Sequence, residues 1–78
     1  MKIGFVLIHV SPLHESEVYN IVSKIPEVSE IHSLFGEYDL IAKIEAENYE
    51  RIGDIVIHKI RSIKGVIDTK TLTGLRSH

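Results

Sequence analysis

The chain is 78 residues long, 44% hydrophobic and 26% charged, with a formal net charge of −2, which predicts one small folded domain rather than a disordered segment. It contains no cysteine, so disulfide bonds and thiolate metal sites are excluded. The lack of a basic excess disfavours direct DNA binding. No apolar run approaches the roughly 20 residues that span a bilayer, so we expect no membrane contact and a cytoplasmic location.

Residues 2–10 are predicted to form a central strand, because they are apolar on both faces. One face carries Ile3, Phe5, Leu7 and His9, and the other carries Gly4, Val6, Ile8 and Val10. A single layer of helices can cover only one of these faces. Since a small domain without disulfides often gains stability by oligomerising, we expect a second subunit to cover the other face.

A helix is expected after Ser11, which can cap it, with Pro12 at the first helical position. Pro26 ends this helix. Its buried stripe has helical spacing and consists of Val18, Ile21, Val22 and Ile25.

Two strands, 28–35 and 39–45, are expected next, and Gly36 between them can take the positive φ that a hairpin turn needs. Strict alternation along the first of these strands places Val28, Glu30 and His32 on one face. The turn between the strands brings polar and backbone groups together between apolar flanks, and is the best candidate for a binding site.

Asn48 is predicted to cap a second helix. Gly53 lies inside this helix at a cost of about 1 kcal/mol relative to alanine, which favours close packing at that position. Gly65 suits the position just after the helix. The buried stripe comprises Tyr49, Ile52, Ile55, Val56, Ile60 and Ile63.

The last strand is expected over 66–75, followed by a frayed tail over 76–78. Alternation places Ile67, Thr69, Thr71 and Thr73 on one face and Val66, Asp68, Lys70 and Leu72 on the other.

The element order is therefore β-α-β-β-α-β, and the two halves of the chain resemble each other at one constant offset. Ile25, Val28, Leu34 and Gly36 match Ile63, Val66, Leu72 and Gly74. Two similar βαβ units with right-handed crossovers predict a ferredoxin-like α+β sandwich with sheet order 4-1-3-2 and both helices on one face. The apolar content of the opposite face predicts a dimer made by packing sheet on sheet.

The five histidines lack the i, i+4 helical spacing of many zinc sites, so we expect no metal. His9 and His32 are expected to be partly buried and hydrogen-bonded, and His14, His58 and His78 to face solvent. Glycine-rich phosphate loops and a nucleophile elbow are also missing, so we expect no cofactor and no enzymatic activity. An enzyme would need His9 or His32 as a general base beside Tyr38.

Asp39 has two possible roles at the hairpin turn. Its carboxylate could satisfy local backbone amides, or it could hold a ligand ammonium group while turn N–H groups hold a carboxylate. A free amino acid presents both of these groups. The threonines of the last strand are either ordinary strand formers or contribute hydroxyls to a small polar ligand.

Several motifs together resemble the effector-binding domain of the Lrp/AsnC regulators, called RAM for regulation of amino-acid metabolism. They are Ile25-Pro26-Glu27-Val28, then His32, then Gly36-Glu37-Tyr38-Asp39-Leu40, and finally Gly65-Val66 with Thr69 and Thr71. The resemblance covers nearly the whole chain. It implies a ferredoxin-like fold, sheet-on-sheet dimers that assemble into rings, commonly octamers, and an amino-acid site between subunits.

The resemblance also implies which residues form that site. Gly36 would supply backbone contacts, Tyr38 would line the pocket and Asp39 would orient the ligand amine. Thr69 and Thr71 would contribute from the fourth strand, and Leu34 and Phe35 would form the apolar surround. The chain starts directly on its first strand, without the family's helix-turn-helix, so it resembles the stand-alone RAM proteins, and DNA binding is not carried over.

We therefore expect residues 1–78 to be a single non-enzymatic, oligomeric amino-acid sensor, with a full-length Lrp/AsnC regulator as one possible partner. The alternative is a small dimeric α+β-barrel enzyme, such as a cofactor-free monooxygenase, which would need a deep pocket between helices and sheet. A third possibility, an ACT-like regulatory module, would pair its sheets side by side.

Overall fold

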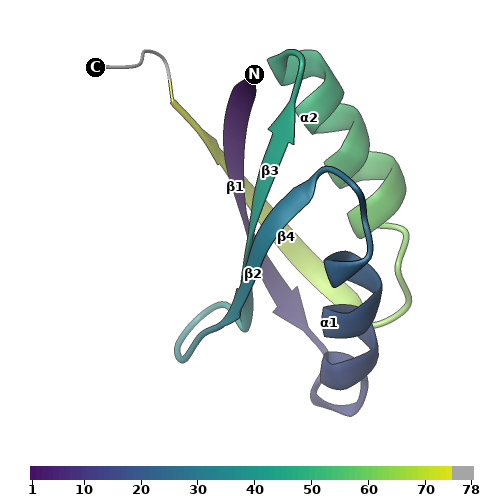
Figure 1. Cartoon of the computed structure of the whole chain (residues 1–78). Helices are drawn as coiled ribbons and strands as arrows, with labels where there is room; N and C mark the ends of the chain where they lie inside the picture. Colours follow the sequence, from purple (N-terminus) through teal and green to yellow (C-terminus); the bar gives the residue numbers. More distant parts are fainter. Residues whose placement is uncertain (75–78) are drawn as a thin grey trace.

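The computed structural model describes residues 1–74 and contains one four-stranded antiparallel sheet with two helices on one side (Figure 1). The elements are β1 (Lys2–Val10), a 3-10 turn (Pro12–His14), α1 (Glu15–Ser23), β2 (Val28–Ser33), β3 (Leu40–Ala46), α2 (Tyr49–Ile55), a π-helical turn (Val56–Ile60) and β4 (Val66–Thr73). The sheet order is β2-β3-β1-β4, which confirms the predicted ferredoxin-like α+β fold. Within residues 1–74, no helix is both long enough and apolar enough to cross a membrane. The predicted tail, with His78, lies outside the described residues.

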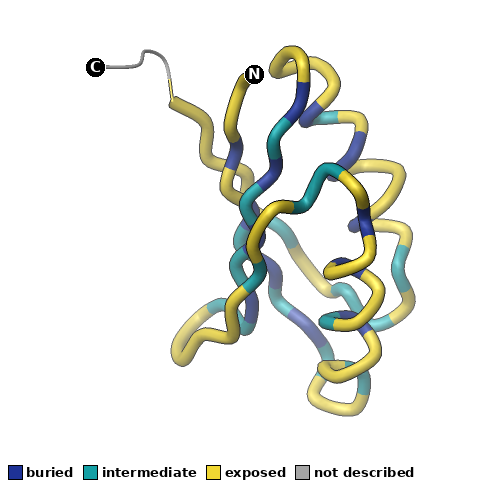
Figure 2. The backbone as a smooth tube through the Cα atoms, viewed as in Figure 1, coloured by how far each residue is buried: buried dark blue, intermediate teal, exposed yellow. Residues whose placement is uncertain are grey.

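The core lies between the sheet and the helices (Figure 2). β1 pairs with β3 through Val6↔Ala42 and with β4 through Val6↔Thr71, so it is a central strand. The buried side chains are Val6, Ile8, Val10, Val18, Val22, Ile25, Leu40, Ala42, Ile44, Ala46, Ile52, Ile55, Val56 and Ile60.

Only one face of β1 is buried in the protomer, which corrects the expectation for both faces. Val6 and Ile8 are fully buried under the helices, whereas Ile3 and Phe5 are exposed on the opposite side. We call this second side of the sheet the open face, because neither helix covers it (Figure 1). The face assignment within β1 follows the predicted alternation.

The two edge strands each carry one extra residue that strict alternation did not predict. The register of β2 on β3 shifts between Val28 and Glu30. The register of β4 on β1 shifts as well, because Asp68 and Val66 pair with the consecutive β1 residues His9 and Val10. Such bulges move the residues before and after them onto opposite faces. The expected common face of Val28 and Glu30 is therefore wrong, as is the common face of Val66 and Asp68.

Several helix details also differ from the prediction. The Ser11 side chain makes no cap hydrogen bond, and the Ser11 backbone N–H donates to the Gly65 carbonyl at 2.8 Å. α1 ends at Ser23, before Pro26, and Ile21 on it is exposed. Tyr49, expected in the buried stripe of α2, is also exposed.

The start of α2 follows the prediction. Asn48 accepts a hydrogen bond from the Arg51 backbone N–H at 2.7 Å, as expected for a cap. A Cβ added at Gly53 would meet no atom within 4 Å, so close packing does not explain that glycine.

Candidate functional site

The chain reversal between β2 and β3 forms a loop that projects from the body of the domain, seen at the lower left of Figure 1. Gly36 has a φ of 119°, as predicted for this turn. The Leu34 backbone N–H donates to the Asp39 carbonyl at 2.8 Å, which closes the loop at its base. The Asp39 N–H donates to the Ile8 carbonyl at 2.9 Å. These bonds anchor the loop to the end of central strand β1.

The carboxylate of Asp39 is held by groups from the same end of β1. Its Oδ2 accepts a hydrogen bond from the Val10 backbone N–H at 2.7 Å and lies 3.0 Å from His9 Nδ1. The Val10 bond, followed by the His9 imidazole, lowers the pKa of Asp39, although partial burial opposes this effect. Among residues 1–74, no donor bonds the second oxygen, Oδ1, which remains available as an acceptor.

Tyr38, next to Asp39 in the sequence, is partly buried and lies near the acidic groups of Asp68 and Glu37. Burial raises the pKa of the Tyr38 hydroxyl, and the charges of Asp68 and Glu37 raise it further. Asp68 is the cross-strand partner of His9 on β4. Residues from the turn, β1 and β4 therefore meet at one end of the sheet.

Leu34 and Phe35 provide apolar surface at the tip of the loop. The Phe35 side chain is fully exposed, and Leu34 is about one-third exposed. Of these two side chains, only Phe35 projects fully into solvent in the protomer.

The structure separates Thr69 and Thr71 from the turn within one protomer. They pair with Ile8 and Val6, which point toward the helices, so the two threonines lie on the helix-bearing side of edge strand β4. His9, in contrast, lies on the open face. One protomer therefore brings together Gly36, Tyr38 and Asp39, but does not add the threonines to them.

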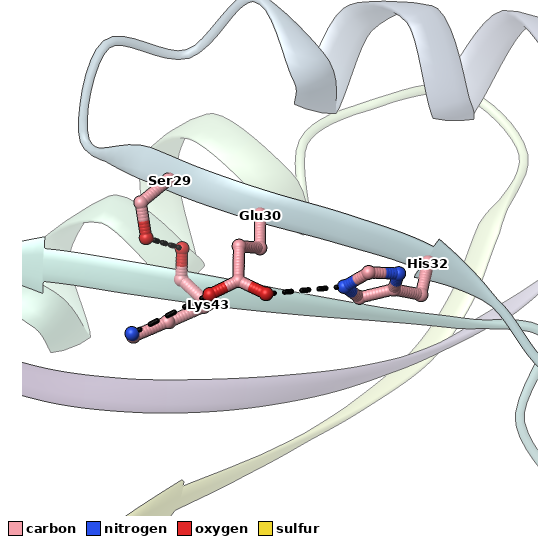
Figure 3. A network of polar contacts seen from close by, with 4 residues as sticks. All are labelled: Ser29, Glu30, His32 and Lys43. Carbon is pink, nitrogen blue, oxygen red and sulfur yellow. Dashed lines mark hydrogen bonds and ion pairs between the residues drawn. The ribbon is translucent and has the colours of Figure 1, made fainter.

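A second polar cluster occupies the open face farther along β2 and β3 (Figure 3). Glu30 Oε1 lies 3.2 Å from His32 Nε2, and Lys43 Nζ donates to Glu30 Oε2 at 3.4 Å. The His32 bond, followed by Lys43, lowers the pKa of Glu30. Each of these three side chains has a partner within the cluster, so the cluster is a surface ion network.

A shallow open groove lies elsewhere, between α1 and the end of β2, and is lined by Glu15, Ser16, Tyr19, Asn20 and Ser33. It does not include the turn residues. Among residues 1–74, no three side chains of His, Cys, Asp or Glu are grouped so that they could hold a metal ion.

His9 contacts this site, although the sequence named it only as a general base for the enzyme alternative and not as part of the amino-acid site. Its predicted state, partly buried and hydrogen-bonded, is confirmed. Its position after a run of apolar residues on the open face was the available signal, but its partner Asp39 is 30 positions away. His14, expected to face solvent, is instead partly buried against Gly65.

The comparisons with known proteins agree with this architecture. The family model described as the Lrp/AsnC ligand binding domain matches residues 3–78. An uncharacterised HTH-type transcriptional regulator of Pyrococcus furiosus is 46% identical over 74 residues, covering 91% of this chain and 49% of that protein. The chain thus spans about half the length of the curated relatives it matches.

Solved structures show the same fold. A Thermus thermophilus crystal structure has a TM-score of 0.94 and 32% identity, covering 100% of this chain and 98% of that one. A Neisseria meningitidis transcriptional regulator in complex with L-Met has a TM-score of 0.85 and 22% identity, covering 96% of this chain and 50% of that one. Because the family match extends over nearly all residues, the chain belongs to the Lrp/AsnC ligand-binding domain family.

Proposed function

We propose that this domain is a non-enzymatic regulatory module of the cytoplasm that binds a free amino acid and thereby modulates transcription of amino-acid metabolism. The observation that carries the proposal is the arrangement at the hairpin turn. One carboxylate oxygen of Asp39 accepts no hydrogen bond from residues 1–74, in a turn that also contains Gly36 and Tyr38. An amino acid presents an ammonium group that such a carboxylate would attract and a carboxylate that suits backbone N–H groups.

The site in this proposal is shared between subunits. One protomer supplies Gly36, Tyr38 and Asp39, with Leu34 and Phe35 as apolar surround. A neighbour supplies Thr69 and Thr71, which fits their separation from the turn within one protomer. The L-Met complex of the Neisseria regulator supports an amino acid as the class of ligand.

The open face supports an oligomer. Ile3, Phe5 and Leu72 lie exposed together on three neighbouring positions of β1 and β4, and burying such a surface is favourable at about 25 cal/mol per Å². We propose that two sheets pack face to face and that dimers assemble further into a ring such as an octamer. A full-length Lrp/AsnC regulator is the proposed macromolecular partner.

The space that a dimeric α+β-barrel enzyme would use as its active site is occupied by side chains. The layer between helices and sheet is filled by branched aliphatic residues such as Ile8, Ile44 and Ile55, and among residues 1–74 no polar side chain is buried there. This packing favours the binding module over the enzyme.

A thermal-unfolding screen against the twenty common amino acids at millimolar concentration tests the proposal. A ligand at about 100 times its Kd adds roughly 2.7 kcal/mol to stability, and each kcal/mol moves Tm by about 4–8 °C for a domain of this size. We expect a rise of about 10 °C or more for one amino acid or a related group.

Two variants test whether the thermal shift depends on the hairpin turn. Asp39→Asn should abolish most of the shift, whereas Asp54→Asn, at an exposed position of α2, should leave it unchanged. A folded, oligomeric wild type that responds to none of the twenty amino acids would overturn the proposed function.

A further inference from the structure

His9 sits where three strands meet on the open face. Its side chain is 44% exposed, and its cross-strand partner on β4 is Asp68. The titratable groups around it come from two elements: Asp39 and Tyr38 from the turn, and Asp68 with Lys70 from β4. His9 is thus the one histidine among residues 1–74 that contacts a residue of the proposed amino-acid site.

The hydrogen bonds to the Asp39 carboxylate hold Oδ2 and leave Oδ1 free to accept a bond from a ligand. The Val10 N–H at 2.7 Å and His9 Nδ1 at 3.0 Å both meet Oδ2. An ionised carboxylate only accepts hydrogen bonds, so Nδ1 of His9 carries the proton in this contact. Two donors on one oxygen restrict rotation of the carboxylate and direct Oδ1 away from the protein bonds.

We propose that His9 is the positioning residue of the amino-acid site, holding Asp39 so that Oδ1 faces the ammonium group of the ligand. This inference rests on the proposed function. His9 need not touch the ligand, because its effect passes through the orientation and charge of Asp39.

The test uses calorimetric titration of the full chain with the L-amino acid that gives the largest thermal shift among the twenty. We expect His9→Leu, which removes the donor, to weaken binding about tenfold at pH 8, as the loss of a hydrogen bond to a charged group predicts. His9→Asn, whose amide nitrogen can replace Nδ1, should bind within about threefold of wild type.

His32 provides the matched control, because it is also an open-face histidine paired with a carboxylate, Glu30. His32→Leu should keep the affinity of wild type. Circular dichroism and the oligomeric state of each unliganded variant establish that the fold is retained.

The outcomes separate this inference from the function on which it rests. Wild-type affinity in a folded His9→Leu variant overturns the role of His9 and leaves the amino-acid site standing. If His9→Leu does not fold, failure of a folded His9→Asn variant to bind the amino acid overturns the inference. A wild type that binds none of the twenty amino acids overturns both proposals.

Discussion

Asp39 has two oxygens with different surroundings. Oδ2 bonds the Val10 N–H and the His9 ring, whereas no donor among residues 1–74 meets Oδ1. The two roles that the sequence allowed for this aspartate are therefore compatible, since one oxygen can stabilise the loop while the other remains free. A mutation of Asp39 can therefore change both the ligand affinity and the stability of the domain, so both must be measured.

The stabilising role of Asp39 should depend on pH. The Val10 N–H, followed by His9, lowers its pKa in the folded state, so its contribution is present above the unfolded pKa, about 3.9. It is lost as the pH falls through the lower folded value. We expect Asp39→Asn to reduce the free energy of unfolding by about 1 kcal/mol at pH 6 and by clearly less at pH 2.

Urea unfolding of wild type and Asp39→Asn at both pH values checks this prediction. Asp54→Asn serves as the control, because that exposed carboxylate has no hydrogen bond among the described residues. An equal destabilisation by Asp39→Asn at pH 6 and pH 2 would show that the charge of Asp39 is not what stabilises the turn.

At the scale of elements, the order and pairing of the strands could be predicted because each rests on local patterns. Gly36 marked the hairpin, Asn48 marked the start of α2, and the resemblance of the two halves indicated the doubled βαβ unit. Which face of the sheet each residue of the edge strands occupies could not be predicted. A bulge depends on register with a neighbouring strand, and nothing in the local sequence at Val28 or Val66 signals the extra residue.

The candidate site could likewise be predicted only where it depends on local sequence. The turn residues follow from local sequence, whereas His9 becomes part of the site only when β1 pairs with β3 and brings it to Asp39. The placement of Thr69 and Thr71 on the helix-bearing side likewise depends on register. Contacts across strands, rather than the elements themselves, are what the sequence left undetermined.

Two glycines in packed elements should respond oppositely to alanine. A Cβ at Gly4 of β1 would lie 2.9 Å from Ile52 Cγ2, in the buried layer under α2, so Gly4→Ala should destabilise the domain by about 1–3 kcal/mol. A Cβ at Gly53 of α2 would meet nothing within 4 Å. Gly53→Ala should therefore stabilise the domain by about 1 kcal/mol, the difference in helix propensity.

Thermal unfolding measures both changes, with each variant acting as the control for the other. We expect Tm to rise by about 4–8 °C for Gly53→Ala and to fall for Gly4→Ala. A lower Tm for Gly53→Ala would indicate that Gly53 lies in a contact with another subunit.

At the scale of the whole molecule, the sheet is covered on one side only. The core fills the layer beneath the helices, while the open face carries apolar side chains at its centre and the Glu30–His32–Lys43 network toward the β2 edge (Figure 3). An apolar centre with a polar rim is the usual composition of a protein interface. This distribution is the physical basis for proposing a second sheet on this face.

The proposed dimer can be tested by placing a charge on either side of the molecule. Phe5 is 40% exposed on the open face, and Ile57 is 54% exposed on the helix layer, so the two side chains are comparably accessible in the protomer. In a sheet-on-sheet dimer, Phe5→Glu would place a charged carboxylate in the apolar centre of the interface, where its loss of hydration is unfavourable, and should shift the protein to monomer. Ile57→Glu should leave the assembly intact, as measured by sedimentation velocity at matched concentrations. Dissociation by Ile57→Glu with an unaffected Phe5→Glu variant would place the interface on the helices and rule out sheet-on-sheet packing.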